Sequence, residues 1–171
     1  NGDIVVLHGC CHNPTGANLS KDQWNIISEL LLEKEAIPFI DIAYQGFGEG
    51  IEEDAFGTRL LANKFPEMFI AASCSKNFGI YRERCGIVMA ISKNPDISII
   101  TQGNLSYVNR QNFSFPPDHG ARLVTMVLRD ADLRADWASE LEQVRIGMLD
   151  ARTHLAEALR TECNSDRFDF L

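Results

Sequence analysis

Residues 37–44, Ile-Pro-Phe-Ile-Asp-Ile-Ala-Tyr, are typical of a short strand that ends near Asp41 and Tyr44. A helical pattern precedes it, with Ser20 as a candidate N-cap, Gln23 at the capping-box position and apolar residues at helical spacing through Lys34. Before that helix, residues 3–8 (Asp-Ile-Val-Val-Leu-His) are typical of a buried strand. Strand, helix and strand in this order indicate a βαβ unit, and therefore an α/β fold with a parallel sheet.

The rest of the chain extends this pattern. Apolar runs over residues 68–72 and 85–91 are typical of strands, and residues 55–64 predict a short helix before the first of them. Further helices are predicted from Pro95 toward Arg110, over the segment that carries residues 123–128, and from Asp130 onward for about thirty residues. A helix that long often bridges two lobes. We therefore expect a large domain over residues 1–143 and, over residues 144–171, the long helix and the start of a smaller domain.

Composition and charge restrict the function. The 171 residues are 45% hydrophobic and 23% charged, which is enough for one sizeable globular core. The net charge of −8 disfavours binding to nucleic acid or to an anionic membrane surface. No apolar stretch approaches the length that spans a bilayer, and the first residues do not have the pattern expected of a signal peptide.

The five cysteines include an adjacent pair, Cys10 and Cys11, but no CxxC spacing. This odd and irregular set predicts reduced thiols and a cytoplasmic location. His8, Cys10, Cys11 and His12 cluster without a second ligand pair, so we expect no metal site. The favoured interpretation of both histidines is a hydrogen-bonded core or rim position.

Both ends of the sequence suggest a piece of a longer chain. The first residues lead directly into a predicted strand, and the last, Arg167-Phe-Asp-Phe-Leu171, form an apolar phrase. We therefore expect a fragment that exposes apolar surface where other parts would pack.

Polar residues gather just after the predicted strands. Asn13, Asp41, Tyr44 and the segment Ser73–Lys76 all follow strand ends. Because ligands bind at the carboxyl ends of strands in open α/β sheets, we expect these side chains to share one site. Taken singly, each has a structural explanation: Asn13 as a turn former before proline, Asp41 as a cap and Tyr44 as a packing residue.

Ser73-Cys-Ser-Lys-Asn-Phe-Gly-Ile-Tyr-Arg-Glu-Arg84 carries the chemistry. A lysine held between two buried strands has low-dielectric surroundings that favour its neutral amine, a nucleophile for carbonyl groups. Ser73, Ser75 and Arg84 supply hydroxyl and guanidinium donors that suit a phosphate. The alternative is a strand end with a solvated lysine and arginine. The nearby glycine-rich loop, residues 45–50, matches neither a P-loop nor GxGxxG, so it predicts no nucleotide site.

Four stretches in order resemble the class I aminotransferases of the aspartate and aromatic amino acid group, which use pyridoxal 5′-phosphate. They are His12-Asn-Pro-Thr-Gly16, Asp41-Ile-Ala-Tyr-Gln-Gly-Phe47, Ser73 to Gly86, and Arg110-Gln-Asn-Phe-Ser-Phe-Pro-Pro117. The resemblance implies a three-layer fold in which a mostly parallel sheet is flanked by helices. It also implies that residues 1–143 are part of a cofactor-binding large domain.

The resemblance further implies roles for the reacting groups. Lys76 would hold the cofactor as a Schiff base and then move the proton of the substrate α-carbon as general base and acid. Asp41 would pair with the pyridinium nitrogen, so that the ring serves as an electron sink. Tyr44 and Asn13 would hydrogen-bond the phenolic oxygen of the ring. The Asn13–Pro14 bond is a candidate cis peptide.

The remaining implied roles concern the phosphate and the substrate. Ser73, Ser75 and Arg84 would hold the phosphate. Arg110 would reach across a homodimer interface to the side-chain carboxylate of a dicarboxylic substrate. The alternative for Arg110 is a surface arginine at a helix end. Phe113 and Phe115 depart from the usual family residues and favour tolerance of aromatic side chains.

The predicted activity is transamination between an amino acid (aspartate, glutamate or aromatic) and a 2-oxo acid. The family's N-terminal phosphate ligands and its α-carboxylate arginine have no counterpart in this sequence, so we do not expect these residues to catalyse the reaction alone. The alternatives are a lyase or decarboxylase on the same cofactor, a non-catalytic aminotransferase-like effector domain, and a truncated chain that folds poorly. The net charge of −8 offers no sign of the basic DNA-binding domain that such an effector requires.

Overall fold

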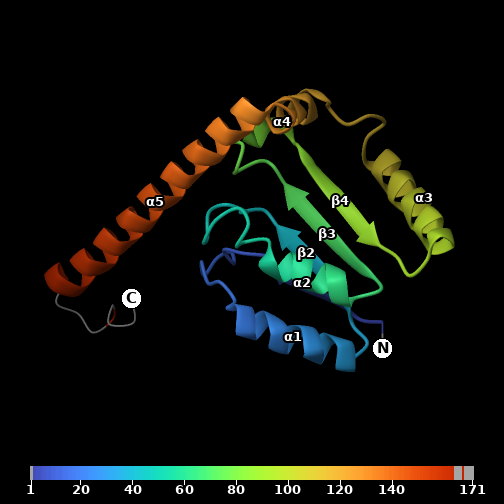
Figure 1. Ribbon diagram of the computed structural model, residues 1–171, viewed down its shortest axis with the longest axis horizontal. Coiled ribbons are helices and arrows are strands. Elements are labelled where there is room, and N and C mark those ends of the chain that lie inside the picture. Colours follow the sequence, from blue (N-terminus) through green and yellow to red (C-terminus); the bar gives the residue numbers. More distant parts are fainter. Residues whose placement is uncertain (1, 164–166, 168–171) are drawn as a thin grey trace.

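The computed structural model describes residues 2–163 and 167. A four-stranded sheet lies at the centre of the molecule (Figure 1). Its strands, in spatial order, are β1 (Ile4–His8), β2 (Ile37–Ile42), β3 (Met68–Ser73) and β4 (Gly86–Ile91). The first three are parallel and β4 runs antiparallel to β3, so the sheet is mixed but mostly parallel.

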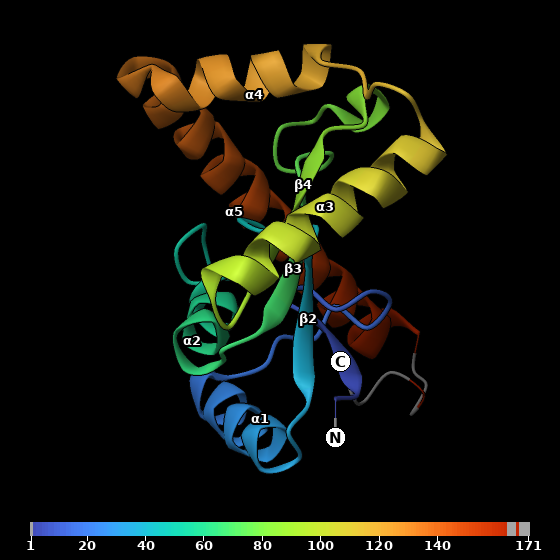
Figure 2. The ribbon, with the colours of Figure 1, turned by 90° about the vertical axis from the view of Figure 1, so that its right-hand side faces the viewer.

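Two helices cover one face of this sheet. They are α1 (Lys21–Glu33), which follows β1, and α2 (Phe56–Lys64), which follows β2. Figure 2 shows them side by side at one side of the strands. Their close approach depends on Gly57, because a Cβ at that position would lie 2.2 Å from a ring carbon of Trp24.

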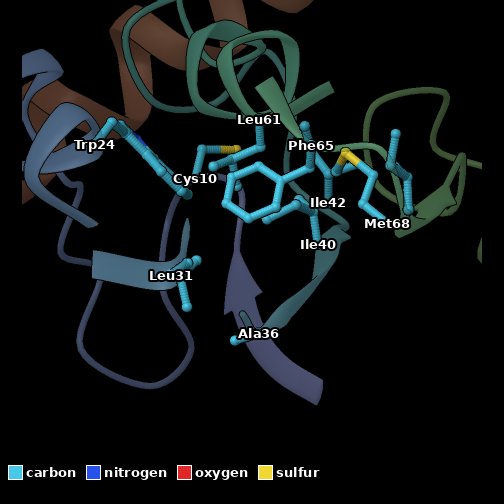
Figure 3. Packing of buried hydrophobic residues seen from close by; sticks show 10 residues of the cluster. Cys10, Trp24, Leu31, Ala36, Ile40, Ile42, Leu61, Phe65 and Met68 are labelled. Atoms are coloured by element: carbon cyan, nitrogen blue, oxygen red, sulfur yellow. The ribbon is translucent and has the colours of Figure 1, made fainter. Parts of the chain in front are cut away.

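The apolar core lies between these helices and the sheet (Figure 3). Side chains alternate along β2, so Ile40 and Ile42 are buried while Asp41 lies on the opposite, exposed face. Leu61 of α2 and Met68 of β3 are fully buried beside Ile40. This packing fixes β2 and β3, and with them the position of the strand ends.

The second half of the chain is more open. An η1 turn (Tyr81–Glu83) precedes β4, and α3 (Pro95–Asn112) then runs alongside that strand (Figure 1). Two more helices follow, α4 (His119–Arg129) and the long α5 (Ala131–Glu162). The carboxyl ends of β2 and β3 point toward α5, so loops after these strands meet that helix (Figure 1).

The predicted elements are confirmed, with small shifts of boundary. Ser20 caps α1 and forms the predicted capping box with Gln23. Residue 55 is the N-cap of α2 and not its first residue. β2 ends at Ile42, so Asp41 lies inside the strand and only Tyr44 follows it.

The expectation that the predicted strands at residues 3–8 and 85–91 are buried is wrong. Ile4 and Val6 of β1 are 56% and 61% exposed, and Ile87 of β4 is 56% exposed. In β1 the reason is the face of the sheet, because Ile4 and Val6 lie on the face of Asp41, opposite the core under α1 and α2. Lys76 therefore follows one buried strand, β3, and precedes an exposed one.

The predicted division between residues 143 and 144 falls inside α5, which is continuous there, and it stays a prediction. Residues 164–166 and 168–171 of the predicted smaller domain lie outside the described residues. None of the described helices is both long enough and apolar enough to cross a membrane. All five cysteines carry free thiols.

Candidate active site

The predicted site residues line two neighbouring hollows at the carboxyl ends of β2 and β3. The first hollow has a volume of about 640 Å³ and lies between the exposed face of the sheet and α3. The predicted residues in its wall are Asp41, Ser73, Ser75 and Arg84. One carboxylate, two hydroxyls and one guanidinium therefore face the same space.

The second hollow, of about 680 Å³, lies between the strand ends and α5. It contains the other three predicted cofactor ligands, Asn13, Tyr44 and Lys76. The Lys76 Nζ atom lies 4.8 Å from the centroid of the Tyr44 ring, within cation–π range. The two hollows adjoin at the peptide bond between Ser75 and Lys76, since one residue lines each.

The loop after β1 is held by side chains of its own sequence. The Asn13–Pro14 peptide is cis, as predicted. The Asn13 amide donates to His8 Nδ1 at 3.1 Å, and His12 Nδ1 bonds the Thr15 hydroxyl at 2.7 Å. Both histidines therefore have the hydrogen-bonded roles that we expected, and they fix the backbone that presents Asn13.

The loop between β3 and β4 presents the phosphate-type donors. Ser75 is buried, and its amide donates to the Ser73 hydroxyl at 3.1 Å. Arg84 adopts the left-handed conformation (φ 51°), and its Nη1 donates to the Tyr81 carbonyl oxygen at 2.8 Å. That turn orients the exposed guanidinium beside the strand end.

The glycine-rich loop after Tyr44 has a structural brace that the sequence reading missed. Asp54 is 5% exposed, and its carboxylate accepts from the amides of Gly46, Gly48 and Glu49 at 2.8–3.0 Å. Three amides of this loop converging on one buried carboxylate give the loop a fixed shape. An acidic residue shortly after a glycine cluster was the available signal.

The helix α5 docks on the two loops that carry Tyr44 and Lys76, a contact that the sequence reading also missed. Trp137 stacks on Phe78 with a centroid distance of 4.5 Å, and its indole N–H donates to the Asn77 carbonyl oxygen at 2.8 Å. One turn further, Leu141 packs on Gly46, where a Cβ would lie 2.5 Å from a Leu141 methyl carbon. The signal was the spacing of these two residues, one helical turn apart.

A third α5 residue completes the docking face. Arg145, one further turn along, donates to the Gly48 carbonyl oxygen at 3.3 Å and pairs with Glu142 at 2.6 Å. This hydrogen-bonded pairing holds the pKa of Glu142 below its usual value and raises the pKa of Arg145. The second hollow therefore has a charged and firmly held helical wall.

Cys10 and Cys11, near the second hollow, have thiol pKa values that are shifted in opposite directions. Cys11, which lines the hollow, accepts a hydrogen bond from Cys10 that lowers the pKa of the Cys11 thiol. The same bond, together with burial and the charge of Asp54, raises the pKa of Cys10. Among the residues that the structure describes, no group of three or more His, Cys, Asp or Glu side chains could hold a metal ion.

Arg110 belongs to neither hollow. It is exposed near the end of α3, and its guanidinium lies 5.9 Å from the Phe115 ring centroid. Its predicted reach toward a neighbouring site stays a prediction.

The chemical groups in the two hollows are of the types that pyridoxal phosphate requires. Hydroxyl groups and a guanidinium suit its phosphate, and a carboxylate suits a protonated ring nitrogen. An amine in the adjoining hollow suits its aldehyde. The grouping of Asp41 with Ser73, Ser75 and Arg84 in one wall is the structural observation behind this fit.

Comparisons with known proteins agree with this chemistry. The family model for aminotransferase class I and II matches residues 1–170. An aromatic-amino-acid aminotransferase from Paracoccus denitrificans is 58% identical over 170 residues, which are 99% of this chain and 43% of the relative. An aspartate aminotransferase from Pseudomonas aeruginosa is 43% identical over 168 residues, 98% of this chain and 42% of the relative.

A solved structure is similar in fold as well. The aromatic-amino-acid aminotransferase from Burkholderia pseudomallei, covalently bound to pyridoxal phosphate, superposes with a TM-score of 0.91 at 42% identity. The match covers 99% of this chain and 42% of that one. The predicted fold class is thereby confirmed, and the chain spans less than half the length of these relatives.

Proposed function

The chain belongs to the aminotransferase class I and II family, and we propose that the protein containing it transfers an amino group between an amino acid and a 2-oxo acid. The observation that carries the proposal is the placement of Lys76 beside Tyr44, directly after the Ser73 and Ser75 donors. The names of the relatives, which include aromatic-amino-acid and aspartate aminotransferases, support transamination over a lyase, a decarboxylase or a non-catalytic module.

When bound, pyridoxal phosphate supplies an aldehyde that reacts with amines and a ring that accepts electrons. Lys76 is the amine in this proposal. Its Nζ atom would hold the cofactor aldehyde and would move the proton of the substrate α-carbon. Lys76 lines the second hollow, whose volume of about 680 Å³ leaves room for a substrate beside it.

Asp41 lies on the exposed face of β2, where its carboxylate holds a proton on the ring nitrogen. Its backbone is fixed by the sheet, since its carbonyl oxygen accepts from the Gly9 amide at 2.8 Å. Tyr44 and Asn13, which line the second hollow, would donate to the phenolic oxygen of the ring. Those donors stabilise negative charge on that oxygen.

Ser73, Ser75 and Arg84 hold the phosphate. The Arg84 fork is suited to two parallel hydrogen bonds with phosphate oxygens, and the buried Ser75 offers a pre-positioned hydroxyl. Anchoring the phosphate orients the reacting carbon toward Lys76.

The substrates of the whole protein are proposed to be aromatic and dicarboxylic amino acids with their 2-oxo acids. Arg110 would recognise a side-chain carboxylate in the neighbouring subunit of a homodimer. Phe113 and Phe115, 48% and 81% exposed, supply apolar surface next to it that suits aromatic side chains. We also propose that the protein acts in the cytoplasm, and that the 171 residues alone are inactive.

The test is a transamination assay on the whole protein, with aspartate and phenylalanine as donors and 2-oxoglutarate as acceptor. Lys76→Ala should lower kcat by about 10²–10⁴-fold or more, because proton transfer is lost along with cofactor attachment. Lys93→Ala is the matched control: Lys93 is exposed and pairs with Glu67 at 2.7 Å, outside both hollows. Full activity in Lys76→Ala would refute the proposal.

Substrate choice is tested separately with Arg110→Ala. The change should lower kcat/KM for aspartate by roughly 10- to 100-fold and leave phenylalanine nearly unchanged, because a charged hydrogen-bonded contact is lost for aspartate alone. Equal losses for the two donors would show that Arg110 does not read the side chain.

A further inference from the structure

The loop that carries Lys76 and Arg84 has a cysteine at each end. β3 ends at Ser73 and β4 begins at Gly86, and these two residues pair across the antiparallel strands. Cys74 and Cys85 are the next pair outward, and the Cys74 amide donates to the Cys85 carbonyl oxygen at 3.0 Å. The two cysteines therefore face each other directly across the ladder.

This geometry is close to that of a disulfide. Opposed residues in an antiparallel pair project their side chains to the same face, with Cβ atoms about 4.5–5.5 Å apart. A disulfide joins Cβ atoms about 3.5–4.5 Å apart, and it accepts the Cα separations found in both kinds of antiparallel pair. Because the Cys74 amide bonds the Cys85 carbonyl oxygen, this is a hydrogen-bonded pair, the wider of the two kinds. A displacement of roughly 1–2 Å thus separates the reduced pair from a bonded one.

The neighbouring structure keeps the two strands together. A Cβ on Gly86 would lie 2.7 Å from the Ala72 carbonyl oxygen, so β4 approaches β3 as closely as glycine permits. On the other side, a Cβ on Gly120 at the start of α4 would lie 3.0 Å from the Cys85 Cβ. Cys85 therefore lies between β3 and the start of α4, directly opposite Cys74.

The electrostatics are consistent with two neighbouring thiols. Burial, followed by the influence of Cys85, raises the pKa of Cys74 to about 11. Both side chains are half-buried, so a small reagent can still reach them. At neutral pH Cys74 is therefore a protonated thiol that persists in the reduced state until an oxidant arrives.

We propose that Cys74 and Cys85 are a redox modification site whose reversible disulfide weakens the binding of pyridoxal phosphate. The disulfide follows from the strand geometry alone, whereas its effect on the cofactor rests on the function proposed above. Cytoplasmic disulfides of this kind are usually transient and regulatory.

The oxidant is a low-molecular-weight disulfide such as oxidised glutathione. The thiolate of one cysteine attacks it, forms a mixed disulfide and releases one small thiolate. The thiolate of the other cysteine then attacks the mixed disulfide, forms the Cys74–Cys85 bond and releases the second. The protein loses two protons and two electrons, the electrons reduce the small disulfide to two thiols, and excess small thiol reverses both steps.

The bond acts where the phosphate donors are. Cys74 lies between Ser73 and Ser75, and Cys85 follows Arg84 and itself lines the first hollow. When the distance between the two cysteines decreases, the neighbouring phosphate donors on both strands move by a fraction of that decrease. A binding site keeps its function only when its donors stay within about 0.5 Å of the productive geometry. Hydrogen bonds to the phosphate are therefore lengthened or lost.

The first experiment maps the bond in the whole protein. After incubation with oxidised glutathione, acid quenching, alkylation and proteolysis, we expect one cross-linked peptide pair containing Cys74 and Cys85. Its mass should be lower than that of the reduced peptides by two hydrogen atoms, and dithiothreitol should separate the pair. Mixed glutathione adducts without a cross-link would overturn the proposal.

The second experiment titrates pyridoxal phosphate into the cofactor-free protein in its reduced and oxidised forms, followed by absorbance. Oxidation should raise the dissociation constant about tenfold, the effect of one lost hydrogen bond to a charged group. Cys74→Ser and Cys85→Ser should abolish both the cross-link and the oxidation effect. Cys163→Ser, which changes an exposed thiol at the end of α5, should retain both.

The remaining outcomes separate the two claims. A cross-link with equal affinities in both forms would overturn the effect on the cofactor and leave the redox pair. A cross-linked protein whose reduced form binds no pyridoxal phosphate would refute the proposed function, and with it the cofactor half of this inference.

Discussion

The two halves of the molecule differ in how much of their apolar surface is buried. Residues 4–73 surround a core of their own, in which Ile40, Leu61 and Met68 are fully buried. Residues 86–162 have few buried side chains: α3 has none, and Ile99 and Phe115 are 71% and 81% exposed. Because large apolar patches mark contact surfaces, we expect the second half to pack against something outside these residues. The candidate site lies where the two halves meet.

The largest expected effect is on the free energy of unfolding, and it is tested by one alanine substitution in each half. Leu61→Ala should lower the free energy of unfolding of the 171-residue chain by about 2–5 kcal/mol, because it leaves a cavity in a closed core. Ile99→Ala should change it by less than about 0.5 kcal/mol, since the side chain is already in water. Urea unfolding followed by circular dichroism measures both.

The variants Leu61→Ala and Ile99→Ala should also be compared in the whole protein. If other parts of that protein cover α3, Ile99→Ala should become clearly destabilising there, while the effect of Leu61→Ala stays similar. Equal effects of Ile99→Ala in the two contexts would contradict the idea that this surface is a contact.

The next effect concerns the brace on the glycine-rich loop, at the junction of the halves. Asp54→Ala removes the acceptor for three amides, including the buried Gly46 amide, and should cost about 1–3 kcal/mol of unfolding free energy. Glu53→Ala, at the exposed neighbouring residue, is the control and should stay within about 0.5 kcal/mol. A cost no greater than that of the control would mean that the loop holds its shape without Asp54.

The smallest effect concerns the link from α5 to the Lys76 loop. Trp137→Phe keeps an aromatic ring on Phe78 but removes the donor to the Asn77 carbonyl oxygen, and should cost about 1 kcal/mol. Tyr107→Phe removes an exposed hydroxyl and serves as the control. Thermal unfolding of the two variants gives the comparison, and indistinguishable midpoints would show that the indole hydrogen bond does not hold α5.

Much of the first half could be predicted from sequence, because its signals are local. The capping box at Ser20, the period of the α1 stripe and the turn at Asn13–Pro14 all depend on neighbouring residues. The exposure of β1 and β4 could not be predicted, because an apolar run of β-branched residues looks the same in an outer strand and in a central one.

The candidate site shows the same division. The residues with distinctive chemistry, such as Lys76 and Asp41, could be singled out because they follow or end predicted strands. The brace of Asp54 and the docking of Trp137 depend on pairings of residues 5–8 and 60 positions apart, respectively. Both have a local signal, an acidic residue after a glycine cluster and two apolar residues one helical turn apart. Neither signal identifies the partner, because only the folded chain brings the partners into contact.

The central claim is that Lys76 is the residue that binds the cofactor covalently. The most direct measurement is borohydride reduction of the whole protein in the presence of pyridoxal phosphate, followed by peptide mapping. The account predicts one stoichiometric pyridoxyl label, on Lys76, that disappears in Lys76→Ala and persists in Lys93→Ala. A label spread over several lysines, or a single label elsewhere than Lys76, would contradict it.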